Sequence, residues 1–282
     1  MLNRRTALKQ SALLAATPFA TLENLAPFKG RIQHSVCRWC YGQIPFDTFC
    51  RQVKTIGLKA IDLVGEADWP TLKKHGLTCS MTNGAEISLT KGFNDPTYHD
   101  ELVRRYEDLI PKVAAQGYKQ VICFSGNQNS LTDEEGIRNM AAGIKRLLPL
   151  AERAGVTLVL EMLNSRVDHK GYQADTTEWG VAVCNQLENH PHFKLLYDIY
   201  HMQIMEGDLI RTIQKHQKHI SHYHTGGNPG RNEINQTQEI YYPAIMKALV
   251  AIGFKGYVAQ EFIPKSKNPM ASLREAIQIC DV

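Results

Sequence analysis

The sequence predicts a single-domain α/β protein of the (β/α)8 barrel class, and three features support this prediction. Apolar runs with strand character alternate with stretches whose apolar residues recur at helical spacing. Glycines follow several of the helical stretches, where each helix must stop before the next strand. Acidic or imidazole side chains end the last four apolar runs, and the carboxyl ends of strands are where such barrels carry their functional residues.

Eight runs have strand character, because they are short, mainly apolar and bounded by polar or turn-forming residues. They cover residues 31–36, 59–64, 77–81, 120–124, 156–161, 193–198, 219–224 and 257–261. Eight repeats of strand, loop, helix and strand in about 250 residues indicate the (β/α)8 barrel. A doubly wound open sheet is the competing fold, but no Gly-x-Gly-x-x-Gly follows the first run, so a dinucleotide site has no support.

Helical stretches lie between these runs and have recognisable ends. They cover residues 45–56, 98–116, 133–154, 176–189, 241–252 and 270–279, and the stretches between the second and third runs and between the sixth and seventh are shorter. Asp133 precedes two glutamates and is predicted to cap a helix N-terminus. Gly117, Gly155 and Gly253 are predicted to end helices.

The first 20 residues have the character of a targeting segment. Arg4 and Arg5 precede an Ala/Leu-rich stretch that ends near Ala20, which is typical of a twin-arginine export signal and predicts a periplasmic location. A frayed amphipathic N-terminus is the alternative. The barrel is then expected over residues 21–282.

Composition and charge exclude several classes of protein. With 43% hydrophobic and 21% charged residues the chain is an ordinary globular protein, and no apolar run reaches the roughly 18 residues of a membrane span. Residues 1–20 contain three basic and no acidic residues, so without them the net charge falls from +4 to +1. This small charge gives no support for nucleic-acid binding.

Seven cysteines form no paired framework, although Cys37 and Cys40 have C-x-x-C spacing. Buried or loop thiols are one interpretation of this pair. A bridge between them is the other, and it depends on an exported location.

Four residues, Glu161, Asp198, His224 and Glu261, are candidate metal ligands. Each ends an apolar run, and they are 37, 26 and 37 residues apart, which is about one strand-plus-helix unit per gap. The ends of neighbouring parallel strands lie about 5 Å apart, so the four side chains can converge on one ion. Salt bridges to nearby Arg or Lys are the alternative for any single carboxylate.

Three carboxylates and one imidazole form a hard ligand set, which suits Mn²⁺, Mg²⁺ or Co²⁺ in octahedral geometry. Two coordination positions would stay open for the two oxygens of a hydroxy-carbonyl substrate. The ion could then stabilise an enediolate and allow a proton to move between adjacent carbons. His222 is predicted to face the barrel interior with His224 and to support it rather than act as a fifth ligand.

Several motifs carry a resemblance to a known family. They are E-M-L-N at 161–164, D-I-Y-H at 198–201, G-G-N-P-G-R at 226–231 after His224, and Q-E-F at 260–262. Together they resemble the sugar isomerase/epimerase superfamily of xylose isomerase-like TIM barrels. N-S-R at 164–166, G-Y at 171–172, and the segment 200–207 look most like the hydroxypyruvate isomerases within it.

The resemblance implies roles for individual residues. Glu161, Asp198, His224 and Glu261 would bind the divalent metal, and Glu161 and Glu261 would also move the substrate proton as acid and base. His201 resembles the histidine that holds a substrate oxygen. Arg231 resembles the arginine that meets the far end of the substrate. On the residues alone, His201 could equally cap a helix, and Arg231 could be a plain loop arginine.

The sequence therefore predicts a divalent-metal-dependent isomerase that interconverts hydroxypyruvate and tartronate semialdehyde. The hydroxypyruvate isomerases commonly have Gln where His224 stands, whereas a histidine fits the ketose epimerases. A keto-sugar 3-epimerase is accordingly the alternative. A DNA-lesion endonuclease and a non-catalytic sugar-binding protein are further possibilities, and the first would need more metal ligands than the sequence offers. The resemblance also implies a homo-oligomer.

Overall fold

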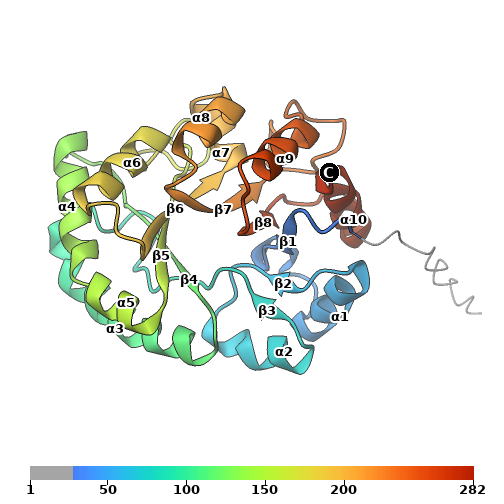
Figure 1. The fold of residues 1–282 in the computed structure, drawn as a ribbon, viewed down its shortest axis with the longest axis horizontal. Coiled ribbons are helices and arrows are strands. Elements are labelled where there is room, and N and C mark those ends of the chain that lie inside the picture. Colours follow the sequence, from blue (N-terminus) through green and yellow to red (C-terminus); the bar gives the residue numbers. More distant parts are fainter. Residues whose placement is uncertain (1–27) are drawn as a thin grey trace, which may run out of the picture.

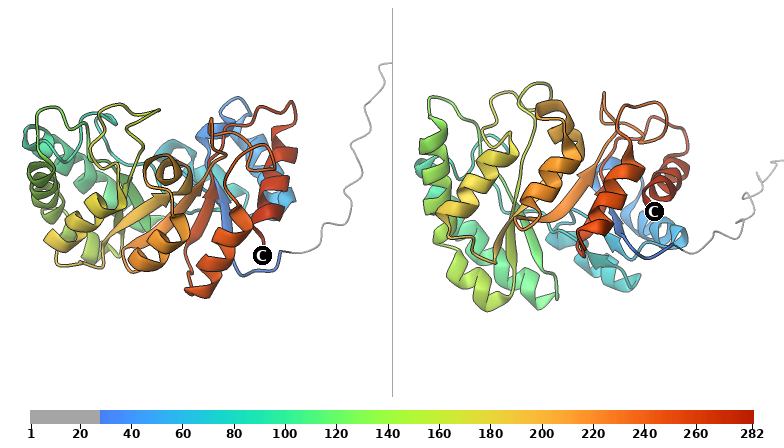
Figure 2. Two further views of the ribbon diagram at one scale, coloured as in Figure 1. Left: turned by 90° about the horizontal axis from the view of Figure 1, so that it is seen from above. Right: turned by 45° about the horizontal axis from the view of Figure 1, so that its top comes forward.

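A curled parallel sheet lies inside a layer of helices in the computed structural model, which describes residues 28–282 (Figure 1). Its strand order is β1-β8-β7-β6-β5-β4. The strands are β1 (Gln33–Val36), β4 (Gln120–Cys123), β5 (Thr157–Glu161), β6 (Phe193–Asp198), β7 (Ile220–Thr225) and β8 (Tyr257–Gln260). The turned views show the same arrangement, with strands inside and helices outside (Figure 2). This half-barrel agrees with the predicted α/β barrel class.

Two shorter strands, β2 (Ala60–Ile61) and β3 (Thr78–Cys79), pair as a separate parallel sheet. Isolated parallel bridges link this pair to the edges of the larger sheet: Cys37 bridges to Asp62 on one side, and Thr82 bridges to Val121 on the other. The second and third strand predictions therefore have the right positions but were too long.

The α-helices of the described residues follow the strands, as the alternating pattern predicts. They are α1 (Phe46–Ile56), α2 (Trp69–Lys74), α3 (His99–Ala115), α4 (Asp133–Lys145), α5 (Leu148–Ala154), α6 (Thr177–Gln186), α7 (Ile199–Met205), α8 (Leu209–His216), α9 (Tyr242–Ala251) and α10 (Pro269–Cys280). The predicted helix 133–154 is divided into α4 and α5. Gly117, Gly155 and Gly253 have positive φ angles of 82°, 63° and 74°, which explains why helices end there.

The predicted N-cap of α4 was wrong by one residue. Thr132 caps the helix, because its hydroxyl accepts from the backbone N–H of Glu135 while the Glu135 carboxylate accepts from the backbone N–H of Thr132. Asp133 is the first helical residue instead. An acidic residue in the first turn favours the helix from either position, so the acid run alone could not distinguish them.

The register of the sheet brings the carboxyl ends of β5 to β8 to one level. Asp198 pairs directly with His224, Glu161 pairs with Leu196, and His224 pairs with Ala259. Glu261 follows β8 and its backbone N–H donates to Thr225. The candidate ligands therefore share one end of the barrel interior.

The segment 1–20, with its predicted export signal and the boundary at residue 21, lies outside the described residues. Within residues 28–282, no helix combines the length and apolar character needed to cross a bilayer.

Candidate metal centre

The structure brings the four predicted ligands together. One donor atom from each of Glu161, Asp198, His224 and Glu261 lies within 4.8 Å of the others, and all four side chains are buried. The sequence spacing anticipated this convergence, because each residue lies at or next to the carboxyl end of one of four consecutive parallel strands.

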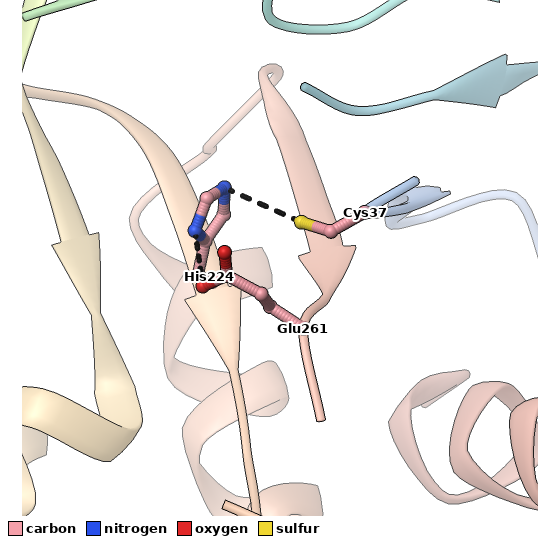
Figure 3. Close-up of side chains that lie close together, drawn as sticks. All are labelled: Cys37, His224 and Glu261. Atoms are coloured by element: carbon pink, nitrogen blue, oxygen red, sulfur yellow. Dashed lines mark hydrogen bonds and ion pairs between the residues drawn. The ribbon is translucent and has the colours of Figure 1, made fainter. Parts of the chain in front are cut away.

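One ring nitrogen of His224 faces Glu261 and the other faces Cys37, the residue after β1 (Figure 3). Its Nδ1 is 2.7 Å from Glu261 Oε2 and 3.5 Å from Glu161 Oε1, so this nitrogen faces the acidic cluster. Its Nε2 faces the other way, 3.0 Å from Asp62 and 3.9 Å from the Cys37 sulfur. One ring nitrogen is therefore placed where a cation bound by the acids would lie.

The two carboxylate oxygens of Asp198 have different roles: one caps a helix and the other faces the site. Oδ1 accepts from the backbone N–H of Tyr200 at 2.8 Å and caps the N-terminus of α7. Oδ2 faces the cluster, 3.2 Å from Arg231 Nη2 and 3.4 Å from His201 Nε2. The helix thus fixes one oxygen so that the other points to the site.

The two glutamates have opposite electrostatic surroundings. Burial and the nearby Glu261 raise the pKa of Glu161. Burial also opposes ionisation of Glu261, but Arg231 and His224 hold its pKa well below the ordinary value. Two carboxyl groups whose pKa values are driven apart are suited to separate acid and base roles.

Arg231 reaches into the acidic cluster from the loop after β7. Its Nη2 is 2.5 Å from Glu261 Oε2, and its guanidinium lies 5.2 Å from the ring centre of Trp39 and 5.5 Å from that of Tyr200. A positive φ of 56° after Gly230 turns the chain at this point. The side chain is held between two aromatic rings with its charge against the acids.

His201 presents a hydrogen-bond donor to the site. The backbone N–H of Asn164 donates to His201 Nδ1 at 3.2 Å, so Nδ1 carries no hydrogen and the neutral ring carries it on Nε2. Burial and Arg231 lower the pKa of His201 well below its ordinary value, which favours this neutral ring. Nε2 is buried and has no hydrogen-bond partner among the described residues. It is therefore free to donate to a substrate oxygen.

The charge and polarity of the cluster fit a divalent cation. Three buried carboxylates face one guanidinium and His224, and with His224 neutral, as a metal ligand must be, two negative charges would remain uncompensated if all three were ionised. Burial and repulsion from Glu261 accordingly raise the pKa of Asp198 to about 7. Glu161 Oε1 is buried without a hydrogen-bond partner among residues 28–282. A divalent ion would supply both the missing charge and the missing partner.

Two residues at the site were not predicted to contact the ligands. Trp39, which is 44% exposed, donates from Nε1 to Glu261 Oε1 at 2.7 Å. Asp62 holds His224 from the side opposite the acids. The available signal for Asp62 was a single acid inside the apolar run 59–64. His222 faces the interior beside His224, with its Nε2 3.0 Å from Asp62 Oδ2, as the strand alternation predicts.

The cysteine question is resolved in favour of free thiols. All seven cysteines lie within the described residues, and each is buried and unbridged. Cys37 and Cys40 therefore form no disulfide in this structure.

Comparison with known proteins identifies one family and several relatives, and the chain spans less than half the length of the first of these relatives. The family described as xylose isomerase-like TIM barrel matches residues 50–281. The chain is 30% identical to 2-oxo-tetronate isomerase of Cupriavidus necator over 41% of this chain and 44% of that protein. It is 26% identical to a putative hydroxypyruvate isomerase of Xenopus laevis, covering 80% of this chain and 88% of that protein. A ketose 3-epimerase of Arthrobacter globiformis is also 26% identical, over 69% of this chain and 67% of the relative.

Solved structures share the TIM-barrel fold. An AP endonuclease, family 2, from Brucella melitensis matches with a TM-score of 0.77 at 22% identity, over 86% of this chain and 97% of that one. The IOLI protein with a binding zinc atom matches with a TM-score of 0.68 at 18% identity, over 88% of this chain and 95% of that one. At these identities the likeness supports the fold alone.

The predicted export and periplasmic location were wrong. They depended only on residues 1–20, and the matched isomerases and epimerases carry no indication of export in their names. An arginine pair before an Ala/Leu-rich stretch is a short and common pattern. Here Ala7 stands where such signals usually have a larger apolar residue, and Pro18 interrupts the stretch.

Proposed function

Since the chain belongs to the xylose isomerase-like TIM barrel family, we propose that it is a divalent-metal-dependent isomerase of small hydroxy-carbonyl compounds. Hydroxypyruvate and tartronate semialdehyde are the proposed substrate pair. The single observation that carries the proposal is the buried convergence of Glu161, Asp198, His224 and Glu261. The similarity to proteins named isomerases and epimerases supports the reaction class.

The four converging residues would hold Mn²⁺, Mg²⁺ or Co²⁺. When bound, the cation would polarise the substrate carbonyl and balance the negative charge that develops as a proton leaves the adjacent carbon. Glu261, whose pKa is held low, is the group better suited to remove that proton. Glu161, whose pKa is raised, is better suited to deliver one.

Two further residues would bind and orient the substrate. The free Nε2–H of His201 points at the cluster and can donate to a hydroxyl or carbonyl oxygen. Arg231 offers a planar fork that matches a carboxylate, and the Trp39 and Tyr200 rings restrict its position. A substrate with a carboxylate at one end and a hydroxy-carbonyl group at the other would use both.

A keto-sugar 3-epimerase is the second candidate. It is favoured by His224, since a histidine at this position fits the ketose epimerases, and by the similarity to a ketose 3-epimerase over two thirds of that protein. Both activities would use the same cation site and the same pair of glutamates. They differ in the carbon that loses its proton.

A substrate panel in deuterated water separates the two candidates. Purified protein is incubated with Mn²⁺ and either hydroxypyruvate or a set of free ketoses, with chelator-treated protein as the control. We expect deuterium uptake and product formation with hydroxypyruvate, both abolished by chelation. Uptake from longer ketoses alone would favour the epimerase, and turnover that persists after chelation would contradict the metal-dependent mechanism.

A further inference from the structure

A second buried cluster lies directly behind the candidate metal centre and shares His224 with it. Asp62, Ser80 and His222, together called the Asp62 cluster here, are at most 5% exposed. Asp62 Oδ1 lies 3.0 Å from His224 Nε2, and Oδ2 lies 3.0 Å from His222 Nε2. The Ser80 hydroxyl also donates to Oδ2. Asp62, which follows β2, therefore contacts one candidate ligand directly, and Ser80, which follows β3, contacts Asp62.

The backbone fixes Asp62 in place even though β2 is short. The Asp62 N–H donates to the Val36 carbonyl at 2.8 Å, and its own carbonyl accepts from Arg38 at 2.9 Å. Leu63 follows with a positive φ of 52°, which is unusual for a leucine and turns the chain away. Both backbone hydrogen-bonding groups of Asp62 are therefore paired, and this fixes the position from which its carboxylate extends.

The partners of Asp62 determine where hydrogens lie on His224. Within residues 28–282, no lysine or arginine forms an ion pair with Asp62, which is completely buried. An ionised carboxylate can only accept hydrogen bonds, so the imidazole nitrogen facing it must carry a hydrogen. His224 Nε2 is 3.0 Å away with hydrogen-bond geometry and is that donor. Glu261 faces Nδ1 at 2.7 Å in the same way, so without a cation both ring nitrogens carry a hydrogen. A cation held by the acids would replace the hydrogen on Nδ1, and Asp62 would keep the one on Nε2.

We propose that Asp62 is a positioning residue that fixes the ring orientation and tautomer of His224, so that Nδ1 is presented to the cation. The Ser80 hydroxyl holds the Asp62 carboxylate in turn by a hydrogen bond, and His222 lies beside it. Histidines that bind metals commonly donate their other N–H to a carboxylate, and loss of such a partner lowers metal affinity by about 10- to 100-fold. The inference rests on the cation site of the proposed function.

The Asp62 cluster could instead be a second metal site, because donor atoms of Asp62, His222 and His224 lie within 4.8 Å of one another. The geometry favours the hydrogen-bonded arrangement. Each oxygen of Asp62 already faces one imidazole nitrogen, and Ser80 supplies a further donor. A second cation would also require His224 to give up the hydrogen on Nε2. Metal stoichiometry distinguishes the two possibilities.

The test compares wild type, Asp62→Asn and the control Glu206→Gln. Glu206 is an acid outside the site, and it accepts from the backbone N–H and hydroxyl of Thr177 at 2.6 and 2.8 Å. Two readouts are needed: the Kd and stoichiometry for Mn²⁺ from electron paramagnetic resonance, and the His224 Nε2–H signal of metal-free, ¹⁵N-histidine-labelled protein. The amide that Asp62→Asn introduces can itself donate a hydrogen bond, and so it no longer fixes the hydrogen on Nε2.

We expect one Mn²⁺ per wild-type chain, and a Kd about 10- to 100-fold weaker in Asp62→Asn but unchanged in Glu206→Gln. The protected Nε2–H signal should be present in wild type and lost in Asp62→Asn. Absence of that signal in wild type, an unchanged Kd in Asp62→Asn, or two Mn²⁺ per wild-type chain would each overturn the positioning role. If wild type binds no Mn²⁺, the cation site of the proposed function fails, and the inferred role of Asp62 toward the cation fails with it. The Nε2–H signal would then still report the Asp62 contact by itself.

Discussion

The two halves of the barrel contribute differently to the candidate site. The four candidate ligands lie at or next to the carboxyl ends of β5 to β8, helix α7 adds His201, and the loop after β7 adds Arg231. The half from β1 to β4 offers no residue to the four-member cluster. Instead, Trp39 and Asp62 contact two of its members from outside. One half holds the candidate ligands, called the ligand half here, and the other, called the supporting half, contacts them from outside.

The strands themselves show the same division. β5 pairs with β6 and β6 with β7 over four residues each, with one register shift between Leu195 and Leu196, and this pairing sets the heights of Glu161, Asp198 and His224. β2 and β3 pair over two residues only and are linked to their neighbours by single bridges. The difference teaches that precise ligand placement comes from extended pairing, while a supporting residue needs only a locally fixed backbone.

Of the substitutions considered, Glu261→Gln should reduce turnover the most. Glutamine keeps the size of the side chain but loses the charge that accepts a proton and attracts the cation, so we expect turnover with saturating Mn²⁺ to fall about 10³-fold. Steady-state kinetics on the best substrate of the panel measures the loss, and thermal unfolding checks that the fold is kept. Glu206→Gln is the control. Activity near that of wild type would refute Glu261 as acid or base.

Metal binding should stabilise the folded protein, and this stabilisation should depend on the four candidate ligands and not on residues of the supporting half. A ligand at 100 times its Kd that binds only the folded state adds about 2.7 kcal/mol to the free energy of unfolding. For a domain of this size that is an increase in Tm of about 5–10 °C. Differential scanning calorimetry of wild type, Asp198→Asn and Trp39→Phe, with and without Mn²⁺, measures it. Asp198→Asn should lose most of the shift and Trp39→Phe should keep it, and equal shifts in all three would place the cation elsewhere.

The sequence predicted the ligand half better than the supporting half, and the reason is physical. Glu161, Asp198, His224 and Glu261 each end an apolar run, and regular spacing along the chain becomes proximity at one end of parallel strands. Asp62 does not belong to a regularly spaced set of residues, so the sequence pattern does not predict its contact with the site. Its partner His224 is 162 residues away, and only the closure of the barrel brings them together.

Trp39 and Arg231 show a second limit of sequence reasoning. Trp39 begins a single 3-10 turn after β1 and Arg231 lies on the loop after β7, so neither strand alternation nor regular helical spacing fixes the direction of these side chains. The contact of Trp39 with Glu261 spans 222 residues. Arg231 lies against Asp198 and Glu261 with a left-handed backbone conformation. The preceding Pro229 and Gly230 indicate a turn but do not predict this conformation. The strand ends were therefore predictable and the loop contacts were not.

Glycine substitutions in the two halves test whether packing controls ligand placement. A Cβ on Gly180 in α6 would lie 2.8 Å from the sulfur of Met162 and 3.0 Å from a Leu195 methyl group, against β5 and β6. A Cβ on Gly143 in α4 would lie 2.8 Å from Phe93 and 2.9 Å from His99. Overpacking of this kind costs about 1–3 kcal/mol, partly offset by the higher helix propensity of alanine.

Gly180→Ala and Gly143→Ala should therefore destabilise the protein by similar amounts, about 1–2 kcal/mol in urea unfolding. Only Gly180→Ala should also weaken Mn²⁺ binding, because Met162 directly follows Glu161 and Leu195 lies in the strand that ends at Asp198. Titration with Mn²⁺ measures this second effect. Equal weakening in both variants would mean that ligand placement depends on the whole barrel rather than on β5 and β6.

Trp39→Phe tests the supporting half and should have the smallest effect on kcat/KM. Phenylalanine keeps an aromatic ring beneath Arg231 but removes the N–H that donates to Glu261 Oε1. Because Trp39 is 44% exposed, water can replace part of this hydrogen bond, so we expect kcat/KM to fall only about tenfold, or about 1.4 kcal/mol.

Trp39→Ala, measured beside it, separates the hydrogen bond from the ring. If the ring also holds Arg231 in place, the alanine variant should lose a further factor of a few, because an exposed cation–π contact contributes about 0.5–1 kcal/mol. This additional loss should fall on KM if Arg231 binds the substrate carboxylate. Equal losses of kcat/KM in the two variants would mean that Trp39 contributes only through its N–H. A loss larger than that of Glu261→Gln would contradict a merely supporting role for this half of the barrel.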